Sequence, residues 1–326
     1  MAKLLGIDIG TTNSKAGLFD EDGKMIAVAS RPTVAHRSEE GYSYYDPEQM
    51  WETLASAICE VMEHASPEEV GAVGIASMAE SGLLVDRKSG SPRSVFMPWF
   101  DTVSAPQAER MAKAGDAYEL FRRTGLRGSF KLGLAKLLWI QDRDPDALRD
   151  SVWLSASGYI AYRLTGAMAS DYSLAARTYA FRIDSKEWDA EWLSQFGLSP
   201  ALFPDALPGG EIVGRTADSV SGMTGLAAGT PVAIAGHDHV AAALAVGAIA
   251  PGVVYDSMGT AETLVGTFQE RPLGKAEFAS GMSYGCHIAS GRYFWMGGNS
   301  SSGGSIEWLR GLLADDALSY ESLFAL

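Results

Sequence analysis

The first stretch of the chain constrains the fold most, because it joins two apolar segments through a polar turn that follows an acid. Leu4–Ile9 predicts a buried strand, interrupted only by Asp8 near its end, and residues 15–19 predict the strand that returns. A carboxylate in such an apolar strand is costly without a partner, so Asp8 indicates a binding function. The alternative is a hairpin whose polar side chains only satisfy the backbone of the turn.

The turn between these two strands has the groups that hold a polyphosphate. Gly10 has no Cβ, so the backbone can bend sharply and approach a ligand closely. Successive N–H groups in such a turn form a concave anion site, to which neighbouring hydroxyl and amide groups add donors. Lys15 adds a point charge, and Asp8 is the kind of hard ligand that Mg²⁺ uses beside phosphate oxygens. The predicted phosphate-binding residues are Gly10, Thr11, Thr12, Asn13 and Lys15.

The composition is that of a soluble globular protein with a substantial core, since 47% of the 326 residues are hydrophobic and 20% are charged. The net charge of −14 without a basic cluster argues against a nucleic-acid or anionic-membrane partner. There is no signal-like N-terminus and no transmembrane run. Only two cysteines occur, and the helical apolar pattern around Cys59 predicts that it lies in the core. We therefore expect a reducing, cytoplasmic setting.

The order of the next elements predicts the opening of a ribonuclease-H-like lobe. Met25–Ser30 predicts a third antiparallel strand. Asp46 and Pro47 open a helix with Gln49 as the capping partner, and Val70–Ala76 predicts a buried parallel strand. Three antiparallel strands, a helix and a parallel strand indicate an α/β lobe of this class.

Two loops that follow predicted strands carry groups suited to holding a polyol. Glu80 follows the strand that ends at Ala76, where a carboxylate can accept hydrogen bonds from hydroxyl groups. Trp99 and Asp101 follow the next apolar segment and offer an aromatic face beside an acid. The alternatives are a solvated loop acid for Glu80, and, for Asp101, the N-cap of a helix starting near Ser104, with Trp99 in the core.

A second candidate centre lies between a predicted buried strand, residues 231–236, and an Ala-rich helix, residues 240–246. Helix N-termini favour negative charge, so Asp238 should be ionised and able to accept the proton of a substrate hydroxyl. Because His237 and His239 flank it, zinc is another interpretation. Adjacent residues on extended backbone point in opposite directions, however, and no third ligand is spaced nearby. The plain alternative is Asp238 as an N-cap.

Taken in order, the motifs resemble the FGGY carbohydrate kinases, which include glycerol kinase and xylulokinase. The resemblance runs along essentially the whole chain and is carried by residues 8–15, 236–239, 258–260 and 305–310. This family has two actin-like lobes, with ATP and Mg²⁺ bound in the cleft between them. The resemblance therefore implies an α/β, ribonuclease-H-like (actin-like ATPase) architecture of two lobes. We expect an N-terminal lobe over residues 1–246 and a partial C-terminal lobe over residues 247–326.

The resemblance also implies roles for individual residues. Glu80 falls where glycerol kinase has a polyol-binding glutamate and where xylulokinases have histidine. His239 stands where Gln or Asn is usual, and Thr102 replaces the arginine that often follows the sugar-contacting acid. The implied site consists of Asp8 and Asp238 for the metal, Asp238 as the catalytic base, Glu80, Trp99, Asp101 and His239 for the substrate, Gly10, Thr11, Thr12, Asn13 and Lys15 for the first phosphate loop, and Gly259 and Thr260 for the second.

The C-terminal lobe departs from the family pattern. Residues 253–268 repeat the pattern of the first stretch of the chain, with a predicted strand, the Gly259–Thr260 turn and a returning strand. Family chains continue into a glycine-rich adenine-binding segment and the signature that names the family, and neither is present here. The expected half-lobe of three antiparallel strands and one or two helices leaves an unpaired edge and an uncovered apolar face. We expect residues 250–326 to be poorly stable alone or to be covered by another chain, for example in a homodimer.

The predicted function is ATP-dependent phosphorylation of a hydroxyl group of a small sugar or polyol, with ATP and Mg²⁺ as cofactors. The competing interpretation is a non-catalytic sugar-binding remnant of such a kinase, because the adenine site is missing. A third interpretation is an actin-like ATPase without a sugar, against which Glu80 and Asp101 argue. The sequence identifies neither the sugar nor the hydroxyl group that receives the phosphate.

Overall fold

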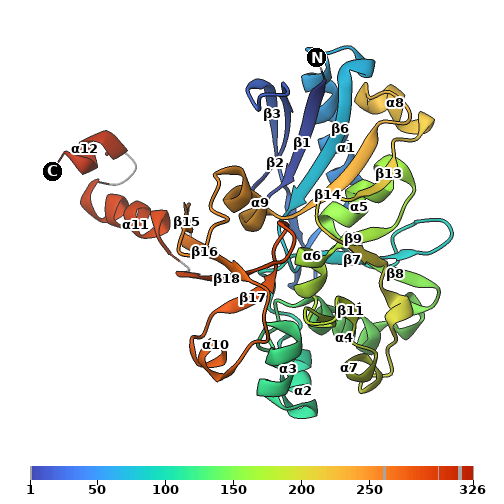
Figure 1. The fold of residues 1–326 in the computed structure, drawn as a ribbon, viewed down its shortest axis with the longest axis vertical. Coiled ribbons are helices and arrows are strands. Elements are labelled where there is room, and N and C mark those ends of the chain that lie inside the picture. The colour runs from blue at the N-terminus through green and yellow to red at the C-terminus, as the bar shows by residue number, and fades with distance from the viewer. Residues whose placement is uncertain (1, 260–261, 300, 315–317, 326) are drawn as a thin grey trace.

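A computed structural model describes residues 2–259, 262–299, 301–314 and 318–325. Its larger part is built on a mixed sheet of six strands in the order β13-β14-β6-β1-β2-β3 (Figure 1). β1, β2 and β3 are antiparallel neighbours, β6 and β14 run parallel to β1, and β13 is antiparallel at the edge. This order confirms the ribonuclease-H-like prediction. The strands are β1 (Lys3–Ile9), β2 (Asn13–Phe19), β3 (Met25–Pro32), β6 (Val70–Ser77), β13 (Ile212–Arg215) and β14 (Pro231–His237).

Two helices, α1 (Pro47–Met62) and α5 (Ala156–Thr165), pack against this sheet and share its core. The start of α1 is the predicted one, since the Asp46 side chain accepts a 2.9 Å hydrogen bond from the Gln49 N–H. The two helices are joined where Arg163 of α5 donates to Glu48 of α1 at 2.6 Å. α8 (Asp218–Thr224) packs beside α1. Cys59 is exposed on α1, so the prediction that it lies in the core is wrong; its side chain falls on the solvent face of an amphipathic helix.

A second core surrounds α4 (Gly133–Arg143) in the segment between β6 and β13. Here β7 (Gly82–Asp86) pairs with β8 (Ser151–Ser155). The other helices of the segment are α2 (Ala105–Ala114), α3 (Ala117–Thr124), α6 (Tyr172–Ala176) and α7 (Ala190–Ser194), with short 3₁₀ turns at Pro145–Leu148 and Pro200–Leu202. Its short strands are β9 (Ala169–Asp171), β10 (Phe181–Arg182), β11 (Glu187–Trp188) and β12 (Asp205–Leu207). Between β3 and β6 along the chain lie β4 (Ala35–Arg37) and β5 (Ser43–Tyr45), which pair with each other, and a 3₁₀ turn at Pro67–Glu69.

A smaller antiparallel sheet follows α9 (Asp238–Ala245) and has the order β15-β16-β18-β17. It joins the larger part through a shared core that includes Phe121 of α3 and Tyr293 of β18. The Tyr293 hydroxyl also donates to the Ile183 carbonyl at 2.7 Å. The expected half-lobe had three antiparallel strands; the structure has four, because β17 pairs with β18. The elements are β15 (Val254–Met258), β16 (Glu262–Gln269), α10 (Lys275–Ala279), β17 (Ser283–Cys286) and β18 (Arg292–Asn299).

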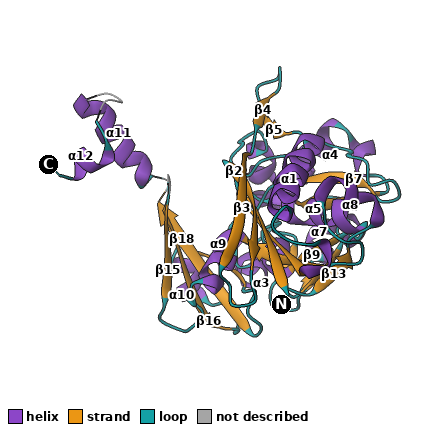
Figure 2. Cartoon of the chain, turned by 90° about the horizontal axis from the view of Figure 1, so that it is seen from above, coloured by secondary structure: helices purple, strands orange, loops and turns teal. Residues whose placement is uncertain are grey.

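The last two helices, α11 (Gly303–Ala314) and α12 (Tyr320–Phe324), project away from the rest of the molecule in both views (Figures 1 and 2). Large apolar side chains on them are exposed, among them Trp308 (66%), Leu312 (64%) and Phe324 (70%). The predicted uncovered apolar face is therefore present. Within the described residues, no helix combines the length and the apolar character needed to cross a bilayer.

Candidate active site at the carboxyl ends of the central strands

The site is set by the register of three neighbouring strands, β1, β6 and β14. Ser77 at the end of β6 pairs with Ile9 on one side and with His237 on the other. Asp8 directly precedes Ile9, and Asp238 directly follows His237. Because two strand spacings separate the outer strands, the two acids sit on backbones about 10 Å apart. Residues that are far apart in the sequence thus lie near one another at the carboxyl ends of these three strands.

The charges of Asp8 and Asp238 act on each other. Burial raises the pKa of the Asp8 carboxyl, the Asp238 carboxylate raises it further, and Lys15 partly offsets both effects. Lys15 lies opposite Asp8 in the β1–β2 register. Two carboxylates that repel one another in a half-buried site suit a cation bound between them. No group of three potential metal-ligating side chains occurs in the ranges that the structure describes.

Asp238 is the first residue of α9, and the N-cap position belongs to His237. The interpretation of Asp238 as a plain N-cap is therefore not what the structure shows. Its Oδ1 accepts a 2.6 Å hydrogen bond from the His239 N–H and lies 3.1 Å from Nδ1 of His237. Burial alone would raise the pKa of Asp238, but the two histidines and the backbone hydrogen bond hold it below its ordinary value. Asp238 is thus ionised at neutral pH and able to accept a proton.

The turn after β1 is closed by a 3.1 Å hydrogen bond from the Gly10 N–H to the Asn13 carbonyl. A Cβ on Gly10 would lie 2.7 Å from that carbonyl oxygen, so the turn requires glycine. The Thr11 hydroxyl accepts a 2.8 Å hydrogen bond from the Trp99 indole. Thr12 and Asn13 are exposed. Of the predicted second phosphate turn, the Gly259 carbonyl accepts from the Gly303 N–H at 2.9 Å, and Thr260 lies outside the described residues.

Glu80 is held in a backbone conformation that is rare for a non-glycine residue, with φ of 58°. Its Oε1 accepts hydrogen bonds from Arg177, one from Nε at 2.8 Å and one from Nη2. Both side chains are largely buried. Burial raises the pKa of Glu80, but Arg177, followed by His237 and Lys136, lowers it below the ordinary value. Glu80 is therefore a fixed, ionised acceptor rather than a solvated loop acid.

The remaining predicted substrate residues are Asp101, Trp99 and His239. Asp101 binds backbone, since its Oδ2 accepts from the Ser43 N–H at 2.6 Å and its Oδ1 from the Val103 N–H at 2.8 Å. It is not the N-cap of α2, which is Ser104. The Trp99 ring is half-buried. Burial lowers the pKa of His239, and the charges of Asp238 and Glu80 oppose that shift.

Two buried basic side chains of this site were not predicted from the sequence. Lys136 on α4 is fully buried, donates to the Lys131 carbonyl, and interacts with the charges of Glu80 and Asp101. Its one sequence signal is its position inside an otherwise apolar helix face. Arg177 ends α6 and pairs with Glu80. Nothing local to Arg177 predicts that pairing, because the two residues are 97 positions apart.

The arrangement combines an ionised base, an ionised hydroxyl acceptor and a backbone turn open to an anion. The base and the turn flank the same strand end, and the acceptor lies on the loop that follows β6. Such a set can bind a polyhydroxy molecule, remove a proton from one hydroxyl and hold a phosphate beside it. These requirements are those of phosphoryl transfer.

Residues 3–245 match the model of the FGGY family of carbohydrate kinases, N-terminal domain. The glycerol kinase of Thermus brockianus is 33% identical over 330 residues, which cover 97% of this chain and 65% of that protein. The xylulose kinase of Bacillus subtilis is 26% identical over 328 residues, covering 99% of this chain and 64% of the relative. The crystal structure of xylulose kinase from Rhodospirillum rubrum superposes with a TM-score of 0.89 at 26% identity, covering 99% of this chain and 65% of that one. The chain thus spans less than two thirds of the length of these relatives.

Proposed function

Because the chain belongs to the FGGY family of carbohydrate kinases, we propose that it serves the ATP-dependent phosphorylation of a hydroxyl group of a small sugar or polyol. The observation that supports this most directly is the strand register that brings Asp8 and Asp238 to the same end of the sheet, where their charges interact. An anion-binding turn and a proton acceptor are then within reach of one substrate hydroxyl. The named relatives are glycerol and xylulose kinases, so polyols and ketoses are the substrates to test first.

In the proposed mechanism, Asp238 accepts the proton of the attacking hydroxyl as that oxygen bonds to the γ-phosphorus of ATP, while the bond from the γ-phosphorus to the β,γ-bridging oxygen breaks and ADP leaves. Glu80 orients the substrate by accepting from another hydroxyl, because its Oε2 has no hydrogen bond within the described structure. Trp99 provides an apolar wall, and Asp101 supports that loop through its backbone hydrogen bonds. His239, whose imidazole interacts with the charges of Asp238 and Glu80, is assigned to the same substrate site.

The phosphates of ATP are assigned to two turns. The first is the turn at residues 11–13, with Lys15 on the adjoining strand β2, and the second is assigned to Gly259 and Thr260. Asp8 and Asp238 would hold Mg²⁺, and their mutual repulsion fits such a cation. When bound, Mg²⁺ neutralises charge on the phosphate oxygens.

The test of the base is Asp238→Asn, which keeps the shape of the side chain and removes its basicity. We expect kcat to fall by about 10²–10⁴-fold, the usual contribution of a positioned base. The matched control is Asp46→Asn at the N-cap of α1, where Asn caps as well as Asp. Turnover of the Asp238 variant equal to that of the control would remove Asp238 from the mechanism.

The alternative is that this chain binds a sugar without transferring phosphate. Titration with MgATP and with glycerol or D-xylulose separates the two functions. A kinase binds both classes of ligand, whereas a sugar-binding protein binds the polyol or the ketose alone. Cytoplasmic localisation and the absence of nucleic-acid and membrane partners stay predictions from composition, and a homodimer stays a prediction from the expected half-lobe.

A further inference from the structure

The short helix α6 (Tyr172–Ala176) lies between the two acids of the proposed site. Its N-cap is Asp171 and its C-cap is Arg177. Contacts from the first turn reach the backbone that carries Asp238, and the C-cap reaches Glu80. The helix therefore contacts Glu80 directly and the backbone N–H of His237, the residue before the proposed base.

At the N-terminal end, a buried chain of hydrogen bonds joins α6 to β14. Asp171 accepts from Ser173 twice, from its N–H at 2.8 Å and from its hydroxyl at 2.6 Å. The Ser173 Oγ accepts in turn from the His237 N–H at 2.9 Å. All three residues are buried. Because the hydroxyl proton is committed to the carboxylate, the lone pair of Ser173 is directed at the amide next to Asp238.

The contact between α6 and β14 is close, and Gly236 makes it so. This residue has φ of +102°, and a Cβ there would lie 2.6 Å from Ser173 Oγ and 3.0 Å from Asp171 Oδ2. Only glycine permits that backbone conformation and that approach together. The end of β14, just before Asp238, thus packs directly against the N-cap of α6.

At the C-terminal end, Arg177 fixes one oxygen of Glu80. Nε and Nη2 both donate to Oε1, so Oε2 is left as the acceptor for a substrate. The positive φ of Glu80 costs free energy and persists only where its surroundings impose it. A two-pronged guanidinium contact restrains both the position and the orientation of the carboxylate, which a lysine ammonium does not.

We propose that α6 is a rigid connector that sets the separation between base and substrate acid, with Ser173 positioning Asp238 and Arg177 positioning Glu80. The five residues from Ser173 to Arg177 are separated by four helical rises, about 6 Å, so a substrate is held at a constant distance from the base. This inference rests on the proposed function for the roles of Asp238 and Glu80. Ser173 and Arg177 themselves are positioning residues and remove no proton.

The test compares Ser173→Ala with Arg177→Lys, because substitutions at the two ends of α6 should change different measured properties. Ser173→Ala should speed hydrogen exchange of the His237 amide by at least about fivefold, the loss of one hydrogen bond, and lower kcat with little change in the Kd for glycerol or D-xylulose. Arg177→Lys should raise that Kd by about tenfold and leave His237 exchange unchanged. It should also raise the pKa of the Glu80 carboxyl, followed by NMR of carboxyl-labelled protein.

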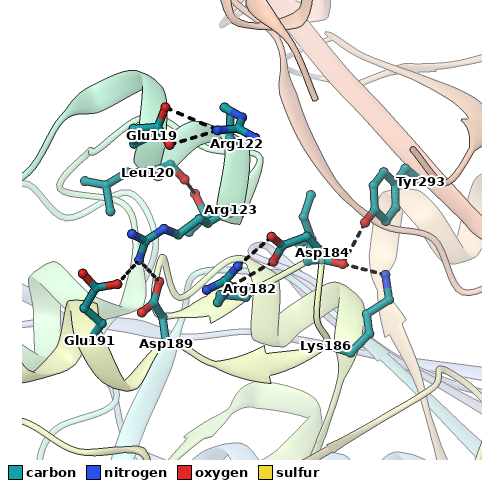
Figure 3. Close-up of polar contacts among 12 residues, drawn as sticks. Glu119, Leu120, Arg122, Arg123, Arg182, Asp184, Lys186, Asp189, Glu191 and Tyr293 are labelled. Carbon is teal, nitrogen blue, oxygen red and sulfur yellow. Dashed lines mark hydrogen bonds and ion pairs between the residues drawn. The ribbon is translucent and has the colours of Figure 1, made fainter. Parts of the chain in front are cut away.

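Matched controls lie outside the site. Ser151→Ala removes another buried hydroxyl, which donates to the Ala147 carbonyl at 2.7 Å. Arg123→Lys alters another arginine that pairs with a buried acid, since Arg123 lies 3.1 Å from Asp189 and 2.9 Å from Glu191 (Figure 3). Both controls should leave His237 exchange, polyol affinity and the Glu80 pKa unchanged.

The proposal is overturned if Ser173→Ala exchanges at His237 like Ser151→Ala, or if Arg177→Lys leaves both polyol affinity and the Glu80 pKa at their wild-type values. A wild-type chain that binds no polyol contradicts the proposed function instead, and the exchange and pKa measurements still decide the connector. If a variant does not fold, the wild-type protein provides the answer. Its His237 amide should be strongly protected and its Glu80 pKa depressed, and the opposite result for either refutes that end of the connector.

Discussion

Replacing Lys136 by methionine tests how a buried charge beside the substrate acid affects stability. The Lys136 side chain is 0% exposed. Burial lowers its pKa from 10.5 to about 7, although Glu80 and Asp101 oppose the shift. Methionine has nearly the same length without the charge, so it preserves packing. The variant therefore isolates the contribution that protonation of Lys136 makes to the free energy of unfolding.

The sign and size of the effect follow from proton binding. Above pH 7 the folded chain carries a mostly neutral lysine, whereas the unfolded chain keeps its proton up to about pH 10. The unfolded state binds more protons, so the free energy of unfolding of the wild type rises with pH in this window. One proton corresponds to about 1.4 kcal/mol per pH unit, and the rise between pH 7.5 and 9.0 is about 2 kcal/mol. Lys136→Met lacks this rise.

Urea unfolding followed by tryptophan fluorescence measures the effect, because the chain has 8 tryptophans. The stability advantage of Lys136→Met over the wild type should shrink by about 2 kcal/mol between pH 7.5 and 9.0. Lys113→Met on α2, where the lysine is exposed, controls for the loss of one positive charge. Parallel pH curves for the wild type and Lys136→Met would show that Lys136 stays charged when folded, which would refute the reasoning.

Three further substitutions test single contacts. Gly236→Ala should destabilise the chain by about 2–3 kcal/mol, since the Cβ would overlap Ser173 at 2.6 Å; a melting temperature equal to that of the wild type would contradict this. Glu80→Ala should weaken glycerol or D-xylulose binding about tenfold or more and leave MgATP binding unchanged, and an equal loss of both in calorimetric titration would make Glu80 structural. Trp99→Phe removes the 2.8 Å hydrogen bond to Thr11 and should weaken MgATP binding about fivefold, with an unchanged Kd as the opposing result.

Local patterns in the sequence were sufficient for α1 and for the strands and turns that carry several of the proposed site residues, whose roles came from the family resemblance. The helix α1 begins at Asp46 as predicted because its cap is encoded within four residues. The strands around Asp8 and before Asp238 were predicted because each is a short apolar run that ends in a glycine or polar turn. Cys59 was predicted to lie in the core but is exposed. The apolar pattern of an amphipathic helix does not show which residues at the border of its apolar face contact the sheet.

What only the tertiary structure decided is which of these residues meet. Asp8 and Asp238 come together through strand register, which long-range pairing sets and no local pattern contains. Arg177 and Lys136 became part of the site because folding buried them against Glu80, where an unpaired charge is too costly to leave. The sequence by itself therefore determined the strand, turn and cap chemistry along the chain, whereas packing determined the distances and charges that make those pieces one site.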